Sequence, residues 1–361
     1  MKTLLDPNNR DLIDAQLAVL HGTDLGDPTV ALVYGNGVSE EDRLYRSQSP
    51  VEQLSVTALG DSLTEIGLKW AELDPCSPAF VQDVTTNYDL VLSNLHGPYG
   101  EDGCLQGLLD WVRVPYCGNG VAACAVGADK IHSKAFMTAL GIPTPPWQVW
   151  NGSAISVRWS GLPLMIKPSL GGSSVGMQLV RHGDELRTAL RRARDVDQAP
   201  VLVEEFISGT PVTVGLLELP GGIVAFPPLT TDVHGADYYD AATKLDADRR
   251  GPVTVELAEF PPHILELLTR HAYTLWDVMG CRGALRVDFI VTGQGVPYAL
   301  EVNPTPGMSR DGNFAIGACT VGMSHADMVR AYVHEALSRP AYDVPLPAPQ
   351  FTGPSRAGNA A

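Results

Sequence analysis

Residues 284–307 read ALRVDFIVTGQGVPYALEVNPTPG, and this stretch decides the fold. Two apolar runs are separated by Thr-Gly-Gln-Gly, a pattern typical of two adjacent β-strands joined by a turn. Asp288 lies in the first run, and Glu301 and Asn303 alternate along the end of the second, so their side chains can share one face. Carboxylate and amide oxygens on neighbouring strands suit Mg²⁺, whose remaining coordination positions water and phosphate can fill.

An ordinary salt-bridged sheet end is the alternative interpretation of these residues. Arg286, two residues before Asp288, is predicted to lie on the same face and could serve as the partner in such a salt bridge. The residues Pro304 to Gly307 nevertheless predict an exposed turn directly after the second strand. Exposed, backbone-rich turns next to rigid strands often carry function, so the sequence favours the metal site.

A second motif, SLGGSSVGM at residues 169–177, follows a predicted strand that contains Lys167. Small residues let the backbone approach an anion closely, hydroxyl groups add donors, and a lysine brings positive charge. The motif lacks the GK[ST] ending of a P-loop. From these residues alone, a phosphate site and a plain Gly-Ser turn are equally open.

The run VLVEEFI, residues 201–207, offers a slot for a nucleotide base. Its apolar side chains lie on one side of a predicted strand and Glu204 on the other, although most buried strands share this pattern. Three lysines lie beside glycine-rich or irregular segments, and they modestly favour phosphate contacts over solvated surface positions: Lys130, Lys167 and Lys244.

The composition excludes several classes of protein. The 361 residues include 25 basic and 41 acidic side chains, giving a net charge of −16, so nucleic acid and anionic membranes are poor partners. No apolar run approaches the roughly 18 residues of a membrane span. The first residues lack the apolar stretch of a secretory signal, so we expect a soluble, cytoplasmic protein. The six cysteines form no CxxC pair and are expected to be buried free thiols.

Taken in order, the motifs resemble those of the D-alanine–D-alanine ligases, a family of the ATP-grasp superfamily. The similarity runs from about Val51 to Ser324 and is densest in six segments: HGPYGEDGCLQG (96–107), DK (129–130), IKPSLGGSSVGM (166–177), VEEFISG (203–209), RVDF (286–289) and EVNPTPGMS (301–309).

The resemblance implies a mixed α/β (α+β) ATP-grasp fold, with a parallel α/β domain before two antiparallel lobes that hold ATP between them. The alternation of strands and helices in the first part of the chain agrees with such a domain. The expected divisions are a polar N-terminal extension before the first regular element (1–28), a substrate domain (29–128), a central ATP-grasp subdomain (129–215), a C-terminal metal-binding subdomain (216–338) with a lid loop of little regular structure (227–252), and a flexible tail (339–361).

The resemblance also implies an ADP-forming carboxylate–amine ligase that makes a dipeptide through an acylphosphate. ATP and two Mg²⁺ ions, for which Mn²⁺ can substitute, are the expected cofactors. The expected partners are amino-acid substrates and a second copy of the chain in a homodimer.

Residue roles follow from the same resemblance. It assigns nucleotide binding to Lys130, Lys167, Ser173, Ser174, Glu204, Phe206, Ile207 and Lys244, and metal binding to Asp288, Glu301 and Asn303. It assigns catalysis to Glu52, Ser173, Lys244, Arg286 and Gly307, with His96 on the side of the first amino acid. In this scheme Glu52 receives an ammonium group, and Arg286 and the Gly307 amide stabilise the tetrahedral intermediate.

The chain departs from the family pattern in four places, one of which concerns the second substrate. Leu245 stands where a tyrosine is usual, Pro211 replaces a ribose-binding glutamate, and residues 39–49 form an insertion. Where the family places Ser-Leu to bind the second amino acid, this chain has Gly312 and Asn313, preceded by Arg310 and Asp311. We therefore hypothesise an active ligase whose acceptor differs from D-alanine, with Arg310 and Asp311 as candidate acceptor contacts.

Two other functions remain open from the sequence. One is a specialised peptide ligase or cyclo-ligase of secondary metabolism that acts on other amino acids. The other is a catalytically silent nucleotide-binding homologue. The joint retention of the lysines, Arg286 and the three predicted metal ligands argues against the silent homologue.

Overall fold

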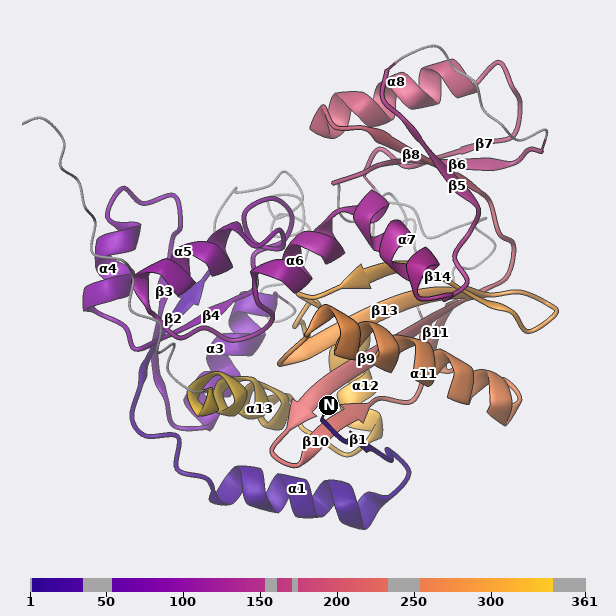
Figure 1. The fold of residues 1–361 in the computed structure, drawn as a ribbon. Helices are drawn as coiled ribbons and strands as arrows, with labels where there is room; N and C mark the ends of the chain where they lie inside the picture. Colours follow the sequence, from indigo (N-terminus) through magenta and orange to yellow (C-terminus); the bar gives the residue numbers. More distant parts are fainter. Residues whose placement is uncertain (1, 35–53, 153–160, 171–174, 233–253, 340–361) are drawn as a thin grey trace, which may run out of the picture.

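The computed structural model describes residues 2–34, 54–152, 161–170, 175–232 and 254–339, and these form three β-sheets with flanking helices (Figure 1). Several predicted features lie outside the described residues: Glu52, Ser173, Ser174, Lys244, Leu245, the insertion 39–49, most of the lid 227–252, and the tail from residue 340. None of the helices within the described ranges is long and apolar enough to span a membrane.

The first sheet is parallel and has the strand order β3-β2-β4. Its strands are β2 (Thr29–Val33), β3 (Lys69–Leu73) and β4 (Leu90–Ser93), and α3 (Ser55–Glu65) and α4 (Phe80–Thr86) connect them. The helix α5 (Cys104–Val112) follows. The predicted parallel α/β unit is therefore confirmed, and the loop that carries His96 leaves the carboxyl end of β4.

The second sheet is antiparallel, with the order β5-β8-β6-β7. It contains β5 (Trp147–Trp150), β6 (Leu164–Pro168), β7 (Gln178–Val180) and β8 (Val201–Glu205), and α8 (Leu186–Asp197) packs on it through buried Ala189, Leu190 and Ala193. Figure 1 shows this sheet and its helix as a separate layer above the rest of the molecule.

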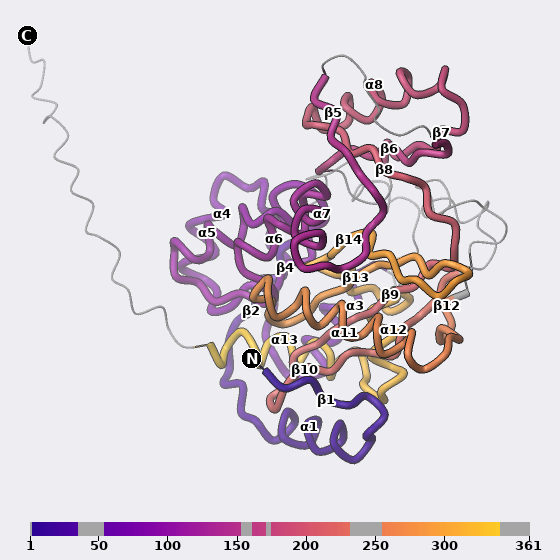
Figure 2. Tube along the Cα trace, turned by 45° about the vertical axis from the view of Figure 1, so that its right-hand side comes forward, coloured from indigo at the N-terminus to yellow at the C-terminus, as the bar shows by residue number. Residues whose placement is uncertain are grey.

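The third and largest sheet is built around β9 (Thr210–Leu219), which pairs with β10, β11 and β13. The other members are β1 (Leu4–Leu5), β10 (Gly222–Ala225), β11 (Leu229–Asp232), β12 (Thr254–Leu257), β13 (Ala284–Val291) and β14 (Pro297–Asn303). Around it lie α6 (Val121–Ala128), α7 (Lys130–Ala139), α11 (Pro262–Met279), α12 (Asn313–Thr320) and α13 (His325–Ser338), as Figure 2 shows.

Three expectations were wrong. Of the cysteines expected to be buried, Cys76, Cys104 and Cys319 are exposed. The first 28 residues, expected to precede the first regular element, contain β1 and the helix α1 (Arg10–Gly22), whose Ile13, Leu17 and Leu20 are buried. Their spacing of three to four residues is helical, but the polar residues around them hid it. The segment 227–252, expected to lack regular structure, begins with β11.

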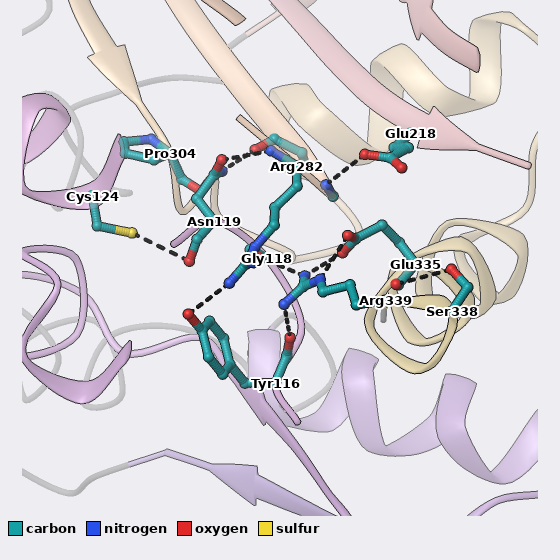
Figure 3. A network of polar contacts seen from close by, with 12 residues as sticks. Tyr116, Gly118, Asn119, Cys124, Glu218, Arg282, Pro304, Glu335, Ser338 and Arg339 are labelled. Carbon is teal, nitrogen blue, oxygen red and sulfur yellow. Dashed lines mark hydrogen bonds and ion pairs between the residues drawn. The ribbon is translucent and has the colours of Figure 1, made fainter. Parts of the chain in front are cut away.

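A polar network joins the end of the first domain to the large sheet and to α13 (Figure 3). Asn119 donates from its side-chain amide to the carbonyls of Ala284 and Pro304, at 2.5 and 2.7 Å. Arg282 donates to the Tyr116 hydroxyl at 2.6 Å, and Arg339 donates to the Tyr116 carbonyl at 2.8 Å. Because Ala284 begins β13 and Pro304 follows β14, Asn119 holds the two antiparallel strands together at their open end, next to the predicted metal ligands.

Candidate active site

The first group of buried charges, which we call the cationic cluster, consists of Lys134, Lys167 and Glu204. Lys134 Nζ lies 2.5 Å from Glu204 Oε2, and Lys167 forms an ion pair with Glu204 Oε1. The exposed fractions of the three side chains are 0%, 8% and 2% respectively. Two lysines and one carboxylate leave a net charge of +1, so the cluster retains attraction for an anion.

The pKa values of the cationic cluster follow from its burial. Burial lowers the pKa of Lys134 to about 8, although the Glu204 carboxylate opposes this shift. Burial alone would raise the pKa of Glu204, but Lys134 and Lys167 together lower it below its usual value. Glu204 therefore stays ionised and compensates charge that water cannot reach.

Local sequence explains how these residues meet. Lys167 and Glu204 lie on β6 and β8, which pair antiparallel so that Met165 faces Glu204 and Lys167 faces Leu202. Lys134 lies on α7, whose start is fixed by the Asp129 side chain, which accepts from the Ile131 and His132 amides.

Lys134 was not among the site residues predicted from the sequence. It lies one helical turn after Lys130 in the segment DKIHSK, so i,i+4 spacing on one helix face was the signal that could have identified it. Lys130 begins α7, and its backbone amide donates to the Ser169 carbonyl at 2.9 Å. Lys130 thus lies at the start of the glycine-rich loop, as its predicted role requires.

The second group, which we call the anionic cluster, consists of Arg286, Asp288 and Glu301. Arg286 donates from Nε to both oxygens of Asp288, each at 3.1 Å, and from Nη2 to Oδ2 at 2.9 Å. Its Nη2 lies 3.8 Å from Glu301 Oε1. Asp288 and Glu301 face each other across β13 and β14, so the predicted shared face is confirmed.

The donor set of this cluster fits a hard divalent cation. Burial and the neighbouring Glu301 raise the pKa of Asp288, although Arg286 opposes the shift, and two carboxylates against one guanidinium leave a net charge of −1. Asn303 Oδ1 accepts from the Thr305 amide at 2.9 Å, which keeps one further lone pair for a ligand. No group of three His, Cys, Asp or Glu suited to a metal occurs in the described ranges, so the predicted set depends on Asn303.

The turn after β14 brings Gly307 to the loop after β4. A Cβ on Gly307 would lie 3.9 Å from His96 Cε1. His96 Nδ1 lies 3.3 Å from Glu101 Oε1, and the other oxygen of Glu101 accepts from the Gly97 amide at 3.0 Å. The negative charge of Glu101 also helps to raise the pKa of Arg286, although burial of the guanidinium opposes this. Glu101 was not predicted, although its place in the motif HGPYGEDG was a usable signal.

A hydrogen-bonded chain connects the two clusters. Lys134 Nζ donates to the Thr144 hydroxyl, and Thr144 donates to the Ala299 carbonyl, both at 2.8 Å. Ala299 lies on β14, two residues before Glu301. The chain therefore links the cationic cluster to β14, the strand that carries Glu301 and leads into the Gly307 turn.

The predicted acceptor residues lie just beyond the turn. Arg310 and Asp311 are exposed, and Arg310 Nη2 lies 3.5 Å from Asp61 on α3. Gly312 is the N-cap of α12 and Asn313 its first residue, and no side chain caps this helix start. Phe206 and Ile207, predicted to frame a base, follow β8 and are half-buried.

Family models provide the comparison that decides the assignment. The model described as D-ala D-ala ligase C-terminus matches residues 136–334, and the one described as D-ala D-ala ligase N-terminus matches residues 37–119. The chain belongs to the D-alanine–D-alanine ligase family. Its activity class is accordingly that of an ATP-dependent, ADP-forming ligase that makes an amide bond.

Curated relatives agree with this family membership. The chain is 36% identical over 266 residues to a D-alanine–D-alanine ligase of Pelotomaculum thermopropionicum, covering 69% of this chain and 80% of the relative. It is 31% identical over 305 residues to D-alanine–D-alanine ligase B of Chromobacterium violaceum, covering 83% and 94%.

Solved structures of family members share the fold. D-alanine–D-alanine ligase of Bacillus anthracis complexed with ATP superposes with a TM-score of 0.71 at 24% identity, covering 86% of this chain and 97% of that one. D-alanyl-alanine synthetase A of Vibrio cholerae gives a TM-score of 0.74 at 23% identity, covering 87% and 99%. The predicted ATP-grasp fold is therefore confirmed.

Proposed function

We propose that this family member uses ATP to phosphorylate the carboxylate of one amino acid and then joins the acyl group to the amine of a second. D-alanine, the substrate named in its relatives, is the proposed first amino acid. The observation that supports the proposal most is the arrangement of three parts: an excess of buried positive charge, an excess of negative charge on paired strands that a hydrogen-bonded chain links to it, and the Gly307 turn after those strands. Phosphoryl transfer requires mainly positioning and charge neutralisation, which these groups can supply.

The cationic cluster is the proposed phosphate site. Lys134 and Lys167 carry more positive charge than Glu204 neutralises, and Lys130 lies beside the glycine-rich loop that would add backbone donors. The proposed phosphate site also includes three residues that only the sequence supports: Ser173, Ser174 and Lys244. Phe206 and Ile207 would contact the base.

The anionic cluster is the proposed metal site. Asp288, Glu301 and Asn303 would hold Mg²⁺, and two such ions are the expected number. A bound Mg²⁺ would neutralise phosphate charge during transfer. Arg286 lies close to both Asp288 and Glu301 and neutralises part of their negative charge, which reduces the repulsion between the two carboxylates.

Arg286 and Gly307 are the proposed groups for the second step. As the amine attacks, negative charge develops on the acyl oxygen, and a backbone amide with a nearby guanidinium stabilises it. Glu52 and His96 would bind the first amino acid, and the contact of His96 with the Gly307 turn supports this placement. The predicted lid at 227–252 would exclude water, since an acylphosphate hydrolyses in wet surroundings.

The acceptor is proposed to lie at the start of α12. Free backbone amides at a helix N-terminus attract a carboxylate, and neither Gly312 nor Asn313 caps them with a side chain. Arg310 forms an ion pair with Asp61, and Asp311 directly precedes the Gly312 N-cap. Arg310, Asp311, Gly312 and Asn313 are therefore the proposed acceptor contacts. Because the usual Ser-Leu pair is replaced, we propose an acceptor other than D-alanine.

The test is phosphate release from ATP and Mg²⁺ across D- and L-amino acids, singly and in pairs, with mass spectrometry of the products. Dipeptide from D-alanine paired with a different amino acid supports both parts of the proposal. D-alanine as the best acceptor by far would contradict the altered acceptor. Phosphate release without any amide product would contradict the ligase mechanism.

The variant Arg286→Ala distinguishes an active ligase from a catalytically silent nucleotide-binding homologue. In an active ligase this variant should abolish turnover while ATP affinity, measured by calorimetry, stays nearly unchanged. Equal phosphate release by the wild type and the variant would show that the measured release does not come from this site.

A further inference from the structure

Two side chains from distant elements hold the two carbonyls that flank Gly307. Asn94, which follows β4, donates from Nδ2 to the Pro306 carbonyl at 3.4 Å, a long hydrogen bond. His325, the first residue of α13, lies with Nε2 2.9 Å from the Met308 carbonyl. The turn is thus contacted from the first domain on one side and from the last helix on the other.

The contact of Asn94 constrains the Gly307 amide directly. The Pro306 carbonyl and the Gly307 N–H belong to one planar trans peptide, so they point in opposite directions. Holding the carbonyl toward Asn94 therefore turns the N–H away from Asn94. Asn94 is 1% exposed, and its Oδ1 has no hydrogen-bond partner among the residues that the structure describes. A buried acceptor without a partner costs folding free energy. Asn94 is therefore a residue whose place in the core packing alone does not explain.

The contact of His325 is well defined because its partners fix the ring. A carbonyl can only accept, so Nε2 carries the hydrogen and donates to Met308. Nδ1 lies 2.7 Å from the hydroxyl of Ser62, a fully buried residue of α3, which donates to it. Burial lowers the pKa of His325 and Arg310 lowers it further, whereas the hydrogen bond to the Met308 carbonyl, Asp61 and Glu65 oppose the shift. The neutral ring is thus the form that fits this contact.

We propose that Asn94 and His325 are positioning residues that orient the Gly307 amide for the amide-forming step. This inference rests on the proposed function of Gly307 and extends it to two residues that do not touch the reacting atoms. Asn94 sets the plane of the peptide that contains the amide, and His325 anchors the next carbonyl along the turn.

The first test compares two substitutions of His325. His325→Phe keeps a ring of similar volume but removes the donor, whereas His325→Gln places an amide donor near the former Nε2. We expect His325→Phe to lower kcat about ten-fold to a hundred-fold, less than the about 100- to 1,000-fold cost of removing such a donor outright. The KM for ATP should not change, and His325→Gln should restore most of kcat. His334→Phe, a half-buried histidine on the same helix, is the control.

A second readout does not need turnover. Hydrogen–deuterium exchange of the peptide covering residues 305–309 should become several-fold faster in His325→Phe and in Asn94→Leu, but not in His334→Phe. This readout separates failure of the inference from failure of the proposed function, because it applies even if the wild type makes no amide product.

Three results would overturn the inference. The first is unchanged exchange in both His325→Phe and Asn94→Leu. The second is an equal loss of kcat in His325→Phe and His325→Gln together with equally lowered thermal stability, which would indicate a purely structural role. The third is a rise in the KM for ATP that accounts for the whole loss of kcat/KM.

Discussion

The cationic and anionic clusters have opposite charge but very different access to solvent. In the cationic cluster the side chains are 0–8% exposed, whereas Arg286 and Asp288 are 21% and Glu301 38% exposed. A charge without water must be compensated by its neighbours, so the cationic cluster is part of the core as well as a ligand site. The anionic cluster can exchange a partner for solvent or a ligand. Substitutions should therefore affect stability first in the former and activity first in the latter.

The largest effect is expected from Glu204→Gln. The change keeps the shape of the side chain but leaves Lys134 and Lys167 buried without a counter-charge. Removing one partner of such a buried pair costs about 3–5 kcal/mol of unfolding free energy, measurable by urea denaturation. Glu205→Gln, at the neighbouring exposed position of β8, should change stability by less than about 0.5 kcal/mol. Similar losses in both variants would contradict the structural role of the cluster.

The pH dependence of the unfolding free energy should reveal the lowered pKa of Lys134. Its pKa is about 8 in the folded chain and 10.5 ordinarily, so between these values the unfolded state binds more protons. Wild-type stability should therefore rise with pH across this window relative to Lys134→Met, by at most about 1.4 kcal/mol per pH unit.

Lys69→Met, which removes an exposed lysine of β3, serves as the control for this titration. Its stability should follow that of the wild type at every pH. A flat difference between wild type and Lys134→Met from pH 8 to 10.5 would mean that Lys134 is not desolvated.

Asp288→Asn should affect activity more than stability. It removes the main partner of Arg286, but Glu301 and solvent remain, so we expect a loss of about 1–3 kcal/mol in unfolding free energy. Phosphate release should require a much higher Mg²⁺ concentration or disappear. Titration of Mg²⁺ against phosphate release, with exposed Glu266→Gln as the control, measures this. Unchanged Mg²⁺ dependence would place the metal elsewhere.

The smallest effect is expected from Arg310→Ala, which breaks an exposed ion pair with Asp61. Exposed pairs contribute about 0–1 kcal/mol, so thermal unfolding should hardly change. Any rise in the KM of the acceptor would then report a substrate contact of Arg310. A large loss of stability would show that this pair behaves like the buried clusters.

The anionic cluster could be predicted from sequence because strand geometry dictates it. In ALRVDFIV and PYALEVN the period of two places Arg286, Asp288 and Glu301 on one face, and the hairpin register follows from the short turn between the strands. The cationic cluster was predicted only in part. Lys167 and Glu204 stood out beside their motifs, but Lys134 has no motif, and its burial depends on two sheets and a helix meeting in space.

The same distinction explains what was missed in the fold. The helix α11 can be recognised in the sequence because its apolar pattern is long and strongly periodic. The two-residue strand β1 and the polar helix α1 carry little local signal, since their stability comes from packing against β10 and α13. The roles of Asn94 and His325 were likewise invisible, because each acts on a backbone carbonyl that no side-chain pattern reveals.

The N-terminal segment has a consequence for the order in which the chain folds. Leu4 and Leu5 pair with Ile223 and Val224, His21 contacts Asp327 across 306 positions, and Arg330 donates to the Leu20 carbonyl. Contacts this distant in sequence close late, because the loop between them must be ordered first. During synthesis Leu5 therefore stays exposed until β10 has emerged from the ribosome, and Ile13 and Leu17 stay exposed until α13 has followed.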